Sequence, residues 1–296
     1  MLINNISISV VVTVKNDEAG VKRLLEDLDK QTVKPDEIII VRSEDYGNCT
    51  RGRGRNIGIR MARNEFIAVT DAGCRPRRDW VERITAGLYK GLAFEYKGQA
   101  LFVVAGWYRA VAETPWQKVF LPYLVPTIKK DKKEKRGKGK TFLPASRSIA
   151  FTKKAWELAG GYPEEPVSGG EDLKFADKLC NHPGINIIYS PKAVVDWPVP
   201  STLTEFIKDM VKHTRGNFEA GYWPHIVRNL NVVARWMIMV IWPWLIPVYL
   251  IWGITRLHQK TAKRWRIRDI AIRVVADAAV FYGTIIGIID GGVIRK

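Results

Sequence analysis

The sequence predicts an α/β protein with a mostly parallel sheet flanked by helices, followed by apolar helices toward the carboxyl end. Two observations predict this class. Short runs rich in Val and Ile alternate with helical apolar patterns up to about residue 220, which is typical of right-handed βαβ units. Long uncharged runs then replace the alternation, as in helices that contact a membrane. We therefore expect a catalytic domain over residues 1–225 and a membrane-associated helical region over residues 226–296.

Two strands and the helix between them are expected first. Residues 6–14 are rich in Val and Ile, as a strand buried on both faces should be. Asn16 and Asp17 can cap the helix that follows, because Asn and Asp are preferred at that position. A second buried strand is expected over residues 37–41, then a turn rich in Gly and Arg, then a short helix from about Asn56.

The alternation continues with a strand over residues 66–71. Pro76 and Asp79 are typical of a helix start, and the pattern loosens after the apolar run of residues 101–105. Residues 129–140 hold eight basic residues and two acids. That composition is too charged to pack into a core.

Regular elements return in the second half. A helix from about Lys153 should end at Gly160-Gly161, because glycine commonly follows the last helical residue. Another helix begins near Glu171, and residues 185–189 form a late strand. Apolar side chains over residues 203–211 recur at the spacing of an amphipathic helix.

The charge balance favours a polyanionic partner. The 296 residues include 47 Lys and Arg against 30 Asp and Glu, a net charge of +17. Nucleic acid, anionic lipid headgroups and phosphorylated small molecules all fit this balance. Three cysteines are too few for a disulfide framework or a zinc cluster, and residues 1–5 lack the basic region of a signal peptide. We expect a reduced, intracellular setting.

Two apolar runs mark the carboxyl end. Residues 236–254 are nineteen residues without a charge, and residues 274–289 are interrupted only by Asp277. A pair of buried helices in a soluble domain would explain both runs. Trp236, Trp242, Trp244 and Trp252 favour membrane contact instead, because tryptophan prefers the membrane interface.

Two membrane topologies are compatible with these runs. Seven basic residues separate them, and a first run that spans the membrane would place these residues outside if the catalytic domain is cytoplasmic. That placement opposes the positive-inside tendency. Pro243 and Pro247 offer an alternative, since they could break the first run into a re-entrant or interfacial hairpin.

Four segments carry side chains suited to a ligand site. Asp71 ends an apolar strand, where ligands of open α/β sheets bind, although a solvated Asp also starts many turns. Residues 52–56 offer backbone amides and arginine to a phosphate. Asp17 could accept hydrogen bonds from a base or ribose. Glu171 and Asp172 follow two glycines at a helix start, although acids there also serve as caps.

In their order and spacing these segments resemble glycosyltransferase family 2, the inverting enzymes with a GT-A fold. The likeness covers roughly residues 6–220. Its motifs are the opening strand Ser9–Asp17, the RNxG helix start Arg55–Gly58, the D-x-D strand end Thr70–Gly73, the segment Leu143–Phe151, Gly160-Gly161-Tyr162 and Gly170-Glu171-Asp172. The resemblance implies a Rossmann-like GT-A sheet and sugar transfer from a nucleoside diphosphate donor.

The resemblance also implies roles for single residues. Asp172 matches the general base that deprotonates an acceptor hydroxyl and so raises its nucleophilicity. Asp71 matches the first acid of D-x-D, which faces the ribose and the metal-diphosphate, and Glu171 and Arg147 would lie on the acceptor side. The residues expected on the nucleotide and donor side are Thr13, Asp17, Ser43, Arg55, Asn56, Asp71, His213 and Arg215.

The chain departs from the family pattern at two places. A divalent metal, Mg or Mn, is implied at Asp71, yet Gly73 stands where the second acid of D-x-D would be, and hard cations take several oxygen ligands. Relatives often carry a base-reading acid after the second strand, where this chain has Arg42-Ser43. The metal and the base are therefore both in question.

The expected function is an inverting hexosyltransferase at the cytoplasmic face of the cell membrane. It would move a sugar from a nucleoside diphosphate-sugar to a lipid-linked or other membrane-proximal acceptor, with anionic lipid attracting its basic residues. A non-catalytic relative that binds a sugar nucleotide is the alternative, and Gly73 is its best argument. Nucleic-acid binding is less favoured, because the charge gathers around the apolar tail and one loop.

Overall fold

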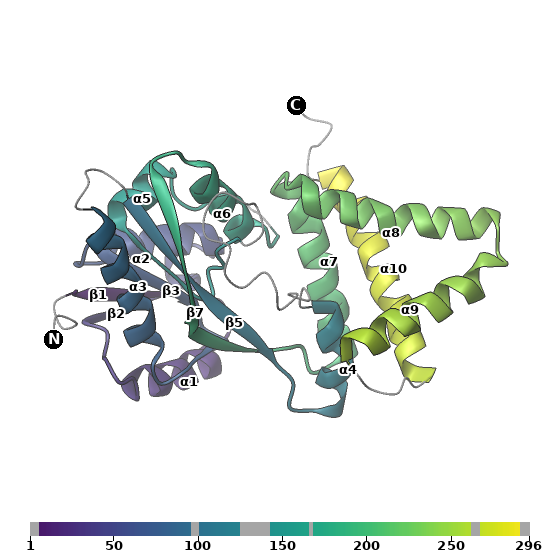
Figure 1. Ribbon diagram of the computed structural model, residues 1–296, viewed down its shortest axis with the longest axis horizontal. Helices are drawn as coiled ribbons and strands as arrows, with labels where there is room; N and C mark the ends of the chain where they lie inside the picture. Colours follow the sequence, from purple (N-terminus) through teal and green to yellow (C-terminus); the bar gives the residue numbers. More distant parts are fainter. Residues whose placement is uncertain (1–5, 96–100, 125–142, 166–167, 262–266, 291–296) are drawn as a thin grey trace. The chain divides into compact units, whose positions relative to one another are not determined.

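The computed structural model describes residues 6–95, 101–124, 143–165, 168–261 and 267–290. The chain forms two compact units (Figure 1). The first comprises residues 1–109, 136–167 and 171–198, and the second comprises residues 110–135, 168–170 and 199–296. The basic run expected at residues 129–140 lies outside the described residues.

A seven-stranded sheet with the order β2-β1-β3-β6-β5-β7-β4 forms the first unit. Its strands are β1 (Ile8–Val14), β2 (Glu37–Arg42), β3 (Phe66–Asp71), β4 (Arg75–Pro76), β5 (Leu101–Val111), β6 (Ile149–Thr152) and β7 (Ile185–Pro198). β1 pairs in parallel with β2 and β3, whereas the pairs β3–β6, β5–β6 and β4–β7 are antiparallel. The α/β class is confirmed, and the sheet contains both parallel and antiparallel pairs.

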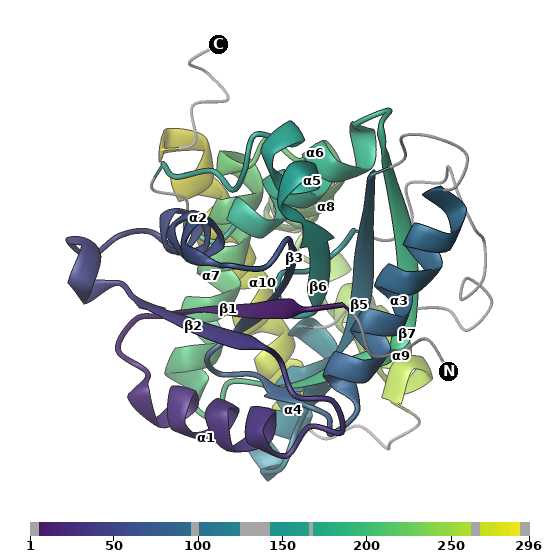
Figure 2. The ribbon, with the colours of Figure 1, turned by 90° about the vertical axis from the view of Figure 1, so that its left-hand side faces the viewer.

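Helices cover both faces of this sheet (Figure 2). They are α1 (Glu18–Asp29), α2 (Arg51–Met61), α3 (Trp80–Glu95), α5 (Lys153–Leu158) and α6 (Glu171–Asn181), with a short 3-10 turn, η1 (Glu44–Tyr46). α1 and α3 pack on one face around Leu24 and Trp80, and α2, α5 and α6 pack on the other around Ile59 and Phe175. All seven residues of β1 are buried, as its composition predicts.

Helix α2 begins earlier than the sequence suggests. The predicted turn of residues 52–56 is helical, because Thr50 caps the helix by accepting a hydrogen bond from the Arg53 amide at 3.2 Å. The glycines serve close packing here. A Cβ at Gly52 would lie 1.9 Å from the carbonyl oxygen of Pro163. The expectation of a turn with a helix from Asn56 was wrong, because tertiary packing outweighs the low helix propensity of glycine.

Strand β2 differs from its expectation as a fully buried strand. It lies at one edge of the sheet, and the side chain of Ile38 is 38% exposed, whereas Ile39 and Val41 are buried. The helix of residues 153–158 does end before Gly160 and Gly161, which both adopt positive φ angles of 70° and 65°. Only glycine adopts that conformation without strain.

The second unit is helical. Its helices are α4 (Pro115–Leu124), α7 (Leu203–Glu219), α8 (Trp223–Ile241), α9 (Leu245–Thr261) and α10 (Ile267–Asp290). α7 is the expected amphipathic helix, and Thr202 and Glu205 form a capping box at its start. α10 packs along α7 (Figure 1). Gly283 permits their close approach, because a Cβ at this position would lie only 2.9 Å from Thr214 Cβ.

The apolar run of residues 236–254 is two helices and no single span. α8 ends at Ile241 and α9 begins at Leu245, with Pro243 between them and Pro247 in the first turn of α9. Figure 1 shows α9 turning back from the end of α8, so that the two helices form a V-shaped hairpin. Among the described residues, one helix, 268–290, is long and apolar enough to cross a membrane, which is weak evidence on its own.

Candidate active site

The carboxyl ends of β1 and β3 form the centre of the site. The two strands are parallel neighbours, and their register places Thr13 beside Asp71. The β3 run is buried up to Thr70, and Asp71 is the first residue of the strand to emerge, with 23% of its side chain exposed. An acid is therefore presented at the edge where ligands of open α/β sheets bind.

Arg55 joins two acids from different elements. Its side chain is 1% exposed; one terminal nitrogen donates to Asp71 Oδ1 at 2.8 Å and the other to Glu171 Oε1 at 3.1 Å. Arg51, one turn earlier on α2, lies 3.7 Å from Glu171 Oε1. The sequence expectation that Arg55, Asp71 and Glu171 share a site is consistent with this placement. The pairing of Arg51 with Glu171 was not predicted, because the sequence analysis began this helix at about Asn56 and not at Arg51.

The buried charges of this cluster set its protonation. Burial alone would raise the pKa of Asp71, but the charges of Arg55, Arg147 and Arg51 outweigh it and lower that pKa to about 2. Burial also acts to raise the pKa of Glu171, and Arg55 and Arg51 bring it below its usual value. Both acids are therefore ionised at neutral pH, and the cluster is a charged network.

Arg147 approaches the same acid from the segment before β6. Its guanidinium lies over two aromatic rings, 4.3 Å from the centroid of Trp197 and 5.0 Å from that of Tyr108. Its Nε is 4.0 Å from Asp71 Oδ2, and the Arg147 carbonyl accepts a hydrogen bond from Thr70. The two rings were not identified from the sequence, because they lie on β5 and β7, about 40 and 50 residues from Arg147 along the chain.

Asp172 is the more accessible acid of the pair at the start of α6. Glu171 is buried and tied to Arg55, whereas Asp172 is half-buried and its Oδ1 accepts from the Leu173 amide at 2.8 Å. The charge of Asp172 acts on Arg55 and Arg147 in this cluster. Asp172 therefore belongs to the same electrostatic site as Asp71 and is the more exposed acid of the pair.

Asp17 lies beside the glycine that replaces the second acid. Its Oδ1 accepts from the Gly20 amide at 2.9 Å and so caps α1, as predicted. A Cβ built on Gly73 would lie 3.6 Å from Asp17 Oδ2. The Asp17 carboxylate thus lies next to the position where an acid at residue 73 would begin.

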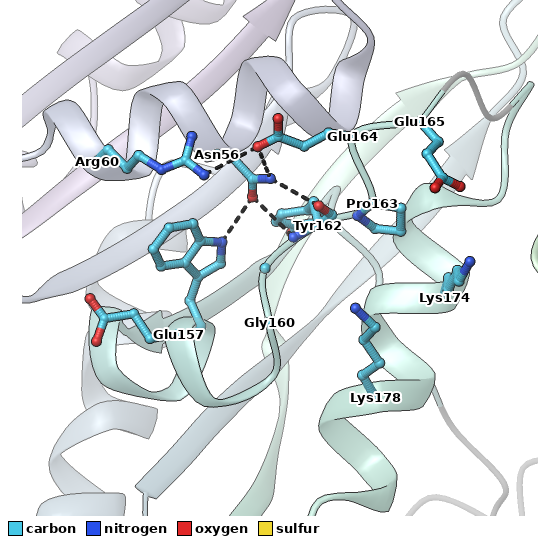
Figure 3. Close-up of a pocket in the computed structure, with 12 residues that line it drawn as sticks. Asn56, Arg60, Glu157, Gly160, Tyr162, Pro163, Glu164, Glu165, Lys174 and Lys178 are labelled. Atoms are coloured by element: carbon cyan, nitrogen blue, oxygen red, sulfur yellow. Dashed lines mark hydrogen bonds and ion pairs between the residues drawn. The ribbon is translucent and has the colours of Figure 1, made fainter.

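Asn56 fills a positioning role in a neighbouring pocket. Its Oδ1 accepts from Trp156 Nε1 and from the Tyr162 amide, both at 3.0 Å, and its Nδ2 donates to the Tyr162 carbonyl and to Glu164 (Figure 3). The pocket, of about 600 Å³, is lined by α2, α5, α6 and the segment between them. Asp71 and Arg147 do not line it. Asn56 therefore orders the segment before α6, and its amide is fully used by the protein.

The remaining predicted donor residues lie in different surroundings. Ser43 is buried and donates to the Cys49 carbonyl at 2.7 Å, and Thr13 Oγ1 is a buried oxygen with no hydrogen-bond partner among the described residues. His213 and Arg215 belong to α7 in the second unit, where they pair with Asp209 and Glu219 at 3.4 and 2.7 Å.

The residues around Asp71 do not fit a divalent metal held by the protein. In the part of the chain that the structure describes, no group of three or more His, Cys, Asp or Glu side chains is placed to hold one. Asp71 Oδ1 is instead occupied by the Arg55 guanidinium, and Gly73 supplies no oxygen. Hard cations take six or more oxygen ligands, whereas the carboxylates of Asp71 and Glu171 are already paired with guanidinium groups.

Comparison with solved structures identifies the fold. No family model matches the chain, and no curated protein matches its sequence. The mannosyltransferase PcManGT from Pyrobaculum calidifontis, in complex with GDP-Man and Mn2+, matches 98% of this chain and 88% of its own length with a TM-score of 0.53 and 15% identity. The fold is of the GT-A type. The GT-A expectation is confirmed, at an identity that establishes the fold alone.

Weaker likenesses are to other glycosyltransferases. TarS 1–349 of S. aureus is 19% identical with a TM-score of 0.44, covering 71% of this chain. GalNAc-T7 with UDP, GalNAc and Mn2+ is 14% identical with a TM-score of 0.46, covering 73% of this chain. The chain spans 64% of the length of the TarS structure and 50% of that of GalNAc-T7.

Proposed function

We propose that this protein is a membrane-associated inverting glycosyltransferase of family 2, of the hexosyltransferase type. One observation carries the proposal: in a GT-A fold, Arg55 bonds both the strand-end acid Asp71 and Glu171, the neighbour of Asp172 at the start of α6. Such a cluster at the carboxyl edge of the sheet suits a nucleoside diphosphate-sugar. PcManGT was solved with a donor of this chemical class.

Asp172 would act as the general base. It would accept the proton of an acceptor hydroxyl while the hydroxyl oxygen bonds to the anomeric carbon, and the bond to the diphosphate oxygen breaks with its electrons leaving on the nucleoside diphosphate. Attack on the face opposite the leaving group inverts the anomeric configuration. Glu171 is buried and paired with Arg55 and Arg51, whereas Asp172 is the more exposed acid of the pair, so the base role is assigned to Asp172.

The donor would be held by residues around the ends of β1 and β3. Asp17, Thr13 and Ser43 around the end of β1 are proposed to bind the nucleoside. Diphosphate binding by His213 and Arg215, which belong to the second unit, stays a prediction from the sequence. Arg55 and Asn56 would act by positioning Asp71 and the segment before α6. The sequence favours Mg or Mn at Asp71, and PcManGT contains Mn2+. Since the described side chains do not fit such an ion, no step is assigned to it.

The second unit favours a membrane-proximal acceptor. The α8–α9 hairpin exposes large apolar side chains, including Val240 at 72%, Trp242 at 51% and Trp244 at 69%. Apolar surface on this scale, with tryptophan at a helix break, is typical of a membrane interface. We propose that residues 226–296 attach the catalytic domain of residues 1–225 to the cytoplasmic face of the cell membrane, where anionic lipid and a lipid-linked acceptor would lie.

A donor screen on the full-length protein tests the proposal. UDP- and GDP-sugars are offered with a membrane lipid extract as acceptor, and release of the nucleoside diphosphate is measured. Asp172→Asn should abolish release and leave donor binding intact, while Asp177→Asn on the same helix serves as the matched control. Equal turnover of Asp172→Asn and the wild type would remove Asp172 from the proposed role.

The same screen separates the alternative functions. A non-catalytic sugar-nucleotide-binding relative, which Gly73 favours, would bind a donor and release nothing with any acceptor. A nucleic-acid-binding protein would bind neither donor and would retain RNA or DNA on a filter at moderate salt.

A further inference from the structure

Arg147 is a guanidinium placed for a ligand. None of its side-chain nitrogens makes a hydrogen bond to any residue that the structure describes, and its Nε is buried. Its side chain is 15% exposed and reaches Asp71 only at 4.0 Å. Because a guanidinium has five hydrogen-bond donors, a buried one without an acceptor has capacity left for an anion.

The surroundings of Arg147 hold it rigidly. The rings of Trp197 and Tyr108 contact its guanidinium at 4.3 and 5.0 Å, and Thr70 anchors its backbone carbonyl at 2.9 Å. Cation–π contacts orient the plane of the group without using its hydrogen-bond donors. The guanidinium of Arg147 is therefore held beside the carboxyl end of β3, and its N–H groups remain available to donate hydrogen bonds.

Residues near Arg147 make a poor metal site and a good anion site. Three arginines, Arg51, Arg55 and Arg147, act on the charge of Asp71, and Arg55 already occupies its Oδ1. Gly73 offers no ligand and lies beside Asp17. A divalent ion placed at Asp71 would be repelled by these guanidinium groups, whereas a diphosphate would be attracted by them.

From this geometry we infer that Arg147, which the sequence assigned to the acceptor side, instead binds the diphosphate of the donor directly, because it lies beside the donor-side acid Asp71. This guanidinium, not a protein-held divalent ion, neutralises the leaving group. The inference rests on the proposed function. As the bond between the anomeric carbon and the diphosphate oxygen breaks, the electron pair stays on that oxygen, and Arg147 donates hydrogen bonds to the developing charge. The acceptor oxygen forms the new bond, and its proton goes to Asp172.

Nucleotide binding by the full-length protein tests this inference. Titration calorimetry with UDP and with GDP is run in EDTA and again in Mn2+, on the wild type, Arg147→Gln, Arg147→Lys and the control Arg109→Gln. Arg109 lies on β5 next to Tyr108, and its guanidinium pairs with Asp196. In EDTA the wild type should bind one nucleotide within about threefold of its affinity in Mn2+. Loss of a charge-assisted contact should weaken binding by about tenfold or more in Arg147→Gln, while Arg109→Gln binds as the wild type does.

Two results would overturn the inference. One is binding that EDTA abolishes and Mn2+ restores in the wild type, a measurement independent of how any variant folds. The other is unchanged nucleotide affinity in Arg147→Gln. Arg147→Lys keeps the charge and should fall between the two, which separates lost charge from lost packing. If the wild type binds neither UDP nor GDP in either buffer, the proposed function fails as well, and the outcomes are thereby distinguished.

Discussion

The guanidinium of Arg55 and the carboxylate of Asp71 form an ion pair of 2.8 Å between a helix and a strand end, with the arginine 1% exposed. The pair holds α2 against the carboxyl end of β3, and through Glu171 it also reaches the start of α6. The three elements that carry the site are therefore joined by one side chain. The stability of the unit and the position of its acids depend on the same contact.

Removing that side chain should destabilise the protein strongly. Arg55→Met leaves Asp71 and Glu171 without their shared partner, and breaking a buried ion pair from one side costs about 3–5 kcal/mol. Urea unfolding, followed by tryptophan fluorescence, measures the loss in the free energy of unfolding. Arg60→Met, on the same helix with 57% of its side chain exposed, should change the free energy of unfolding by less than about 1 kcal/mol. Equal losses in the two variants would contradict this view of Arg55.

The pH dependence of stability should report the Asp71 pair. The folded pKa of Asp71 is lowered to about 2, so its folded state binds fewer protons than the unfolded chain. The stabilisation is therefore present above the unfolded pKa of roughly 4 and is lost as the pH falls through the folded pKa. The stability difference between wild type and Asp71→Asn should shrink by on the order of 2 kcal/mol between pH 4 and pH 2. A difference that stays constant would show that the pair is not charged in the folded protein.

The local parts of this site could be predicted from the sequence. Asp71 at a strand end, Asp17 at a helix cap and Glu171 at a helix start each depend on a few neighbouring residues, so their periodicity and capping patterns were sufficient. The early start of α2 was not predicted, because glycine is unfavourable in helices. Glycine is needed at residue 52 because the backbone of Pro163, more than a hundred residues later in the chain, leaves no room for a Cβ.

Contacts that depend on the order of strands in the sheet could not be predicted from the sequence either. The guanidinium of Arg147 reaches Tyr108 and Trp197 because β6, β5 and β7 are consecutive in the sheet. That order includes antiparallel pairs, which the alternation of strands and helices does not indicate. The hairpin of α8 and α9 shows the opposite case. Pro243 and Pro247 indicated a possible break from the sequence, because proline disrupts a helix.

Asn56→Ala should loosen the segment before α6. The variant removes four hydrogen bonds and leaves the buried Trp156 Nε1 and Tyr162 amide without acceptors. Each unsatisfied buried group costs about 1–3 kcal/mol, so a loss of several kcal/mol is expected in thermal or urea unfolding. Asn64→Ala, whose side chain makes one bond to Ser9, is the control and should cost about 1 kcal/mol. A similar loss in both variants would argue against an ordering role for Asn56.

Gly73→Asp should give the protein a response to divalent metal. The new carboxylate would stand beside Asp17, whose Oδ2 is 3.6 Å from the Cβ position, so two acids and Asp71 would then share one side of the site. Oxygen ligands in that number suit Mg2+ or Mn2+ better than a single acid does. UDP or GDP binding by the variant should rise by about tenfold or more on addition of Mn2+. Gly73→Ala adds volume without charge and should remain insensitive to the ion; a metal response in Gly73→Ala would contradict the argument.

Substitution at the α8–α9 break should release the protein from anionic vesicles. Trp242 and Trp244 are 51% and 69% exposed and flank Pro243, so they are placed to enter the interface at the tip of the hairpin. Removing two interfacial tryptophans should weaken vesicle binding by about tenfold or more, given roughly 25 cal/mol for each Å² of apolar surface buried. Co-sedimentation of Trp242→Ser/Trp244→Ser with vesicles containing phosphatidylglycerol measures this loss. Trp116→Ser, on α4 and also 51% exposed, is the matched control, and equal loss in the control would show that exposed tryptophan alone, without the hairpin, accounts for binding.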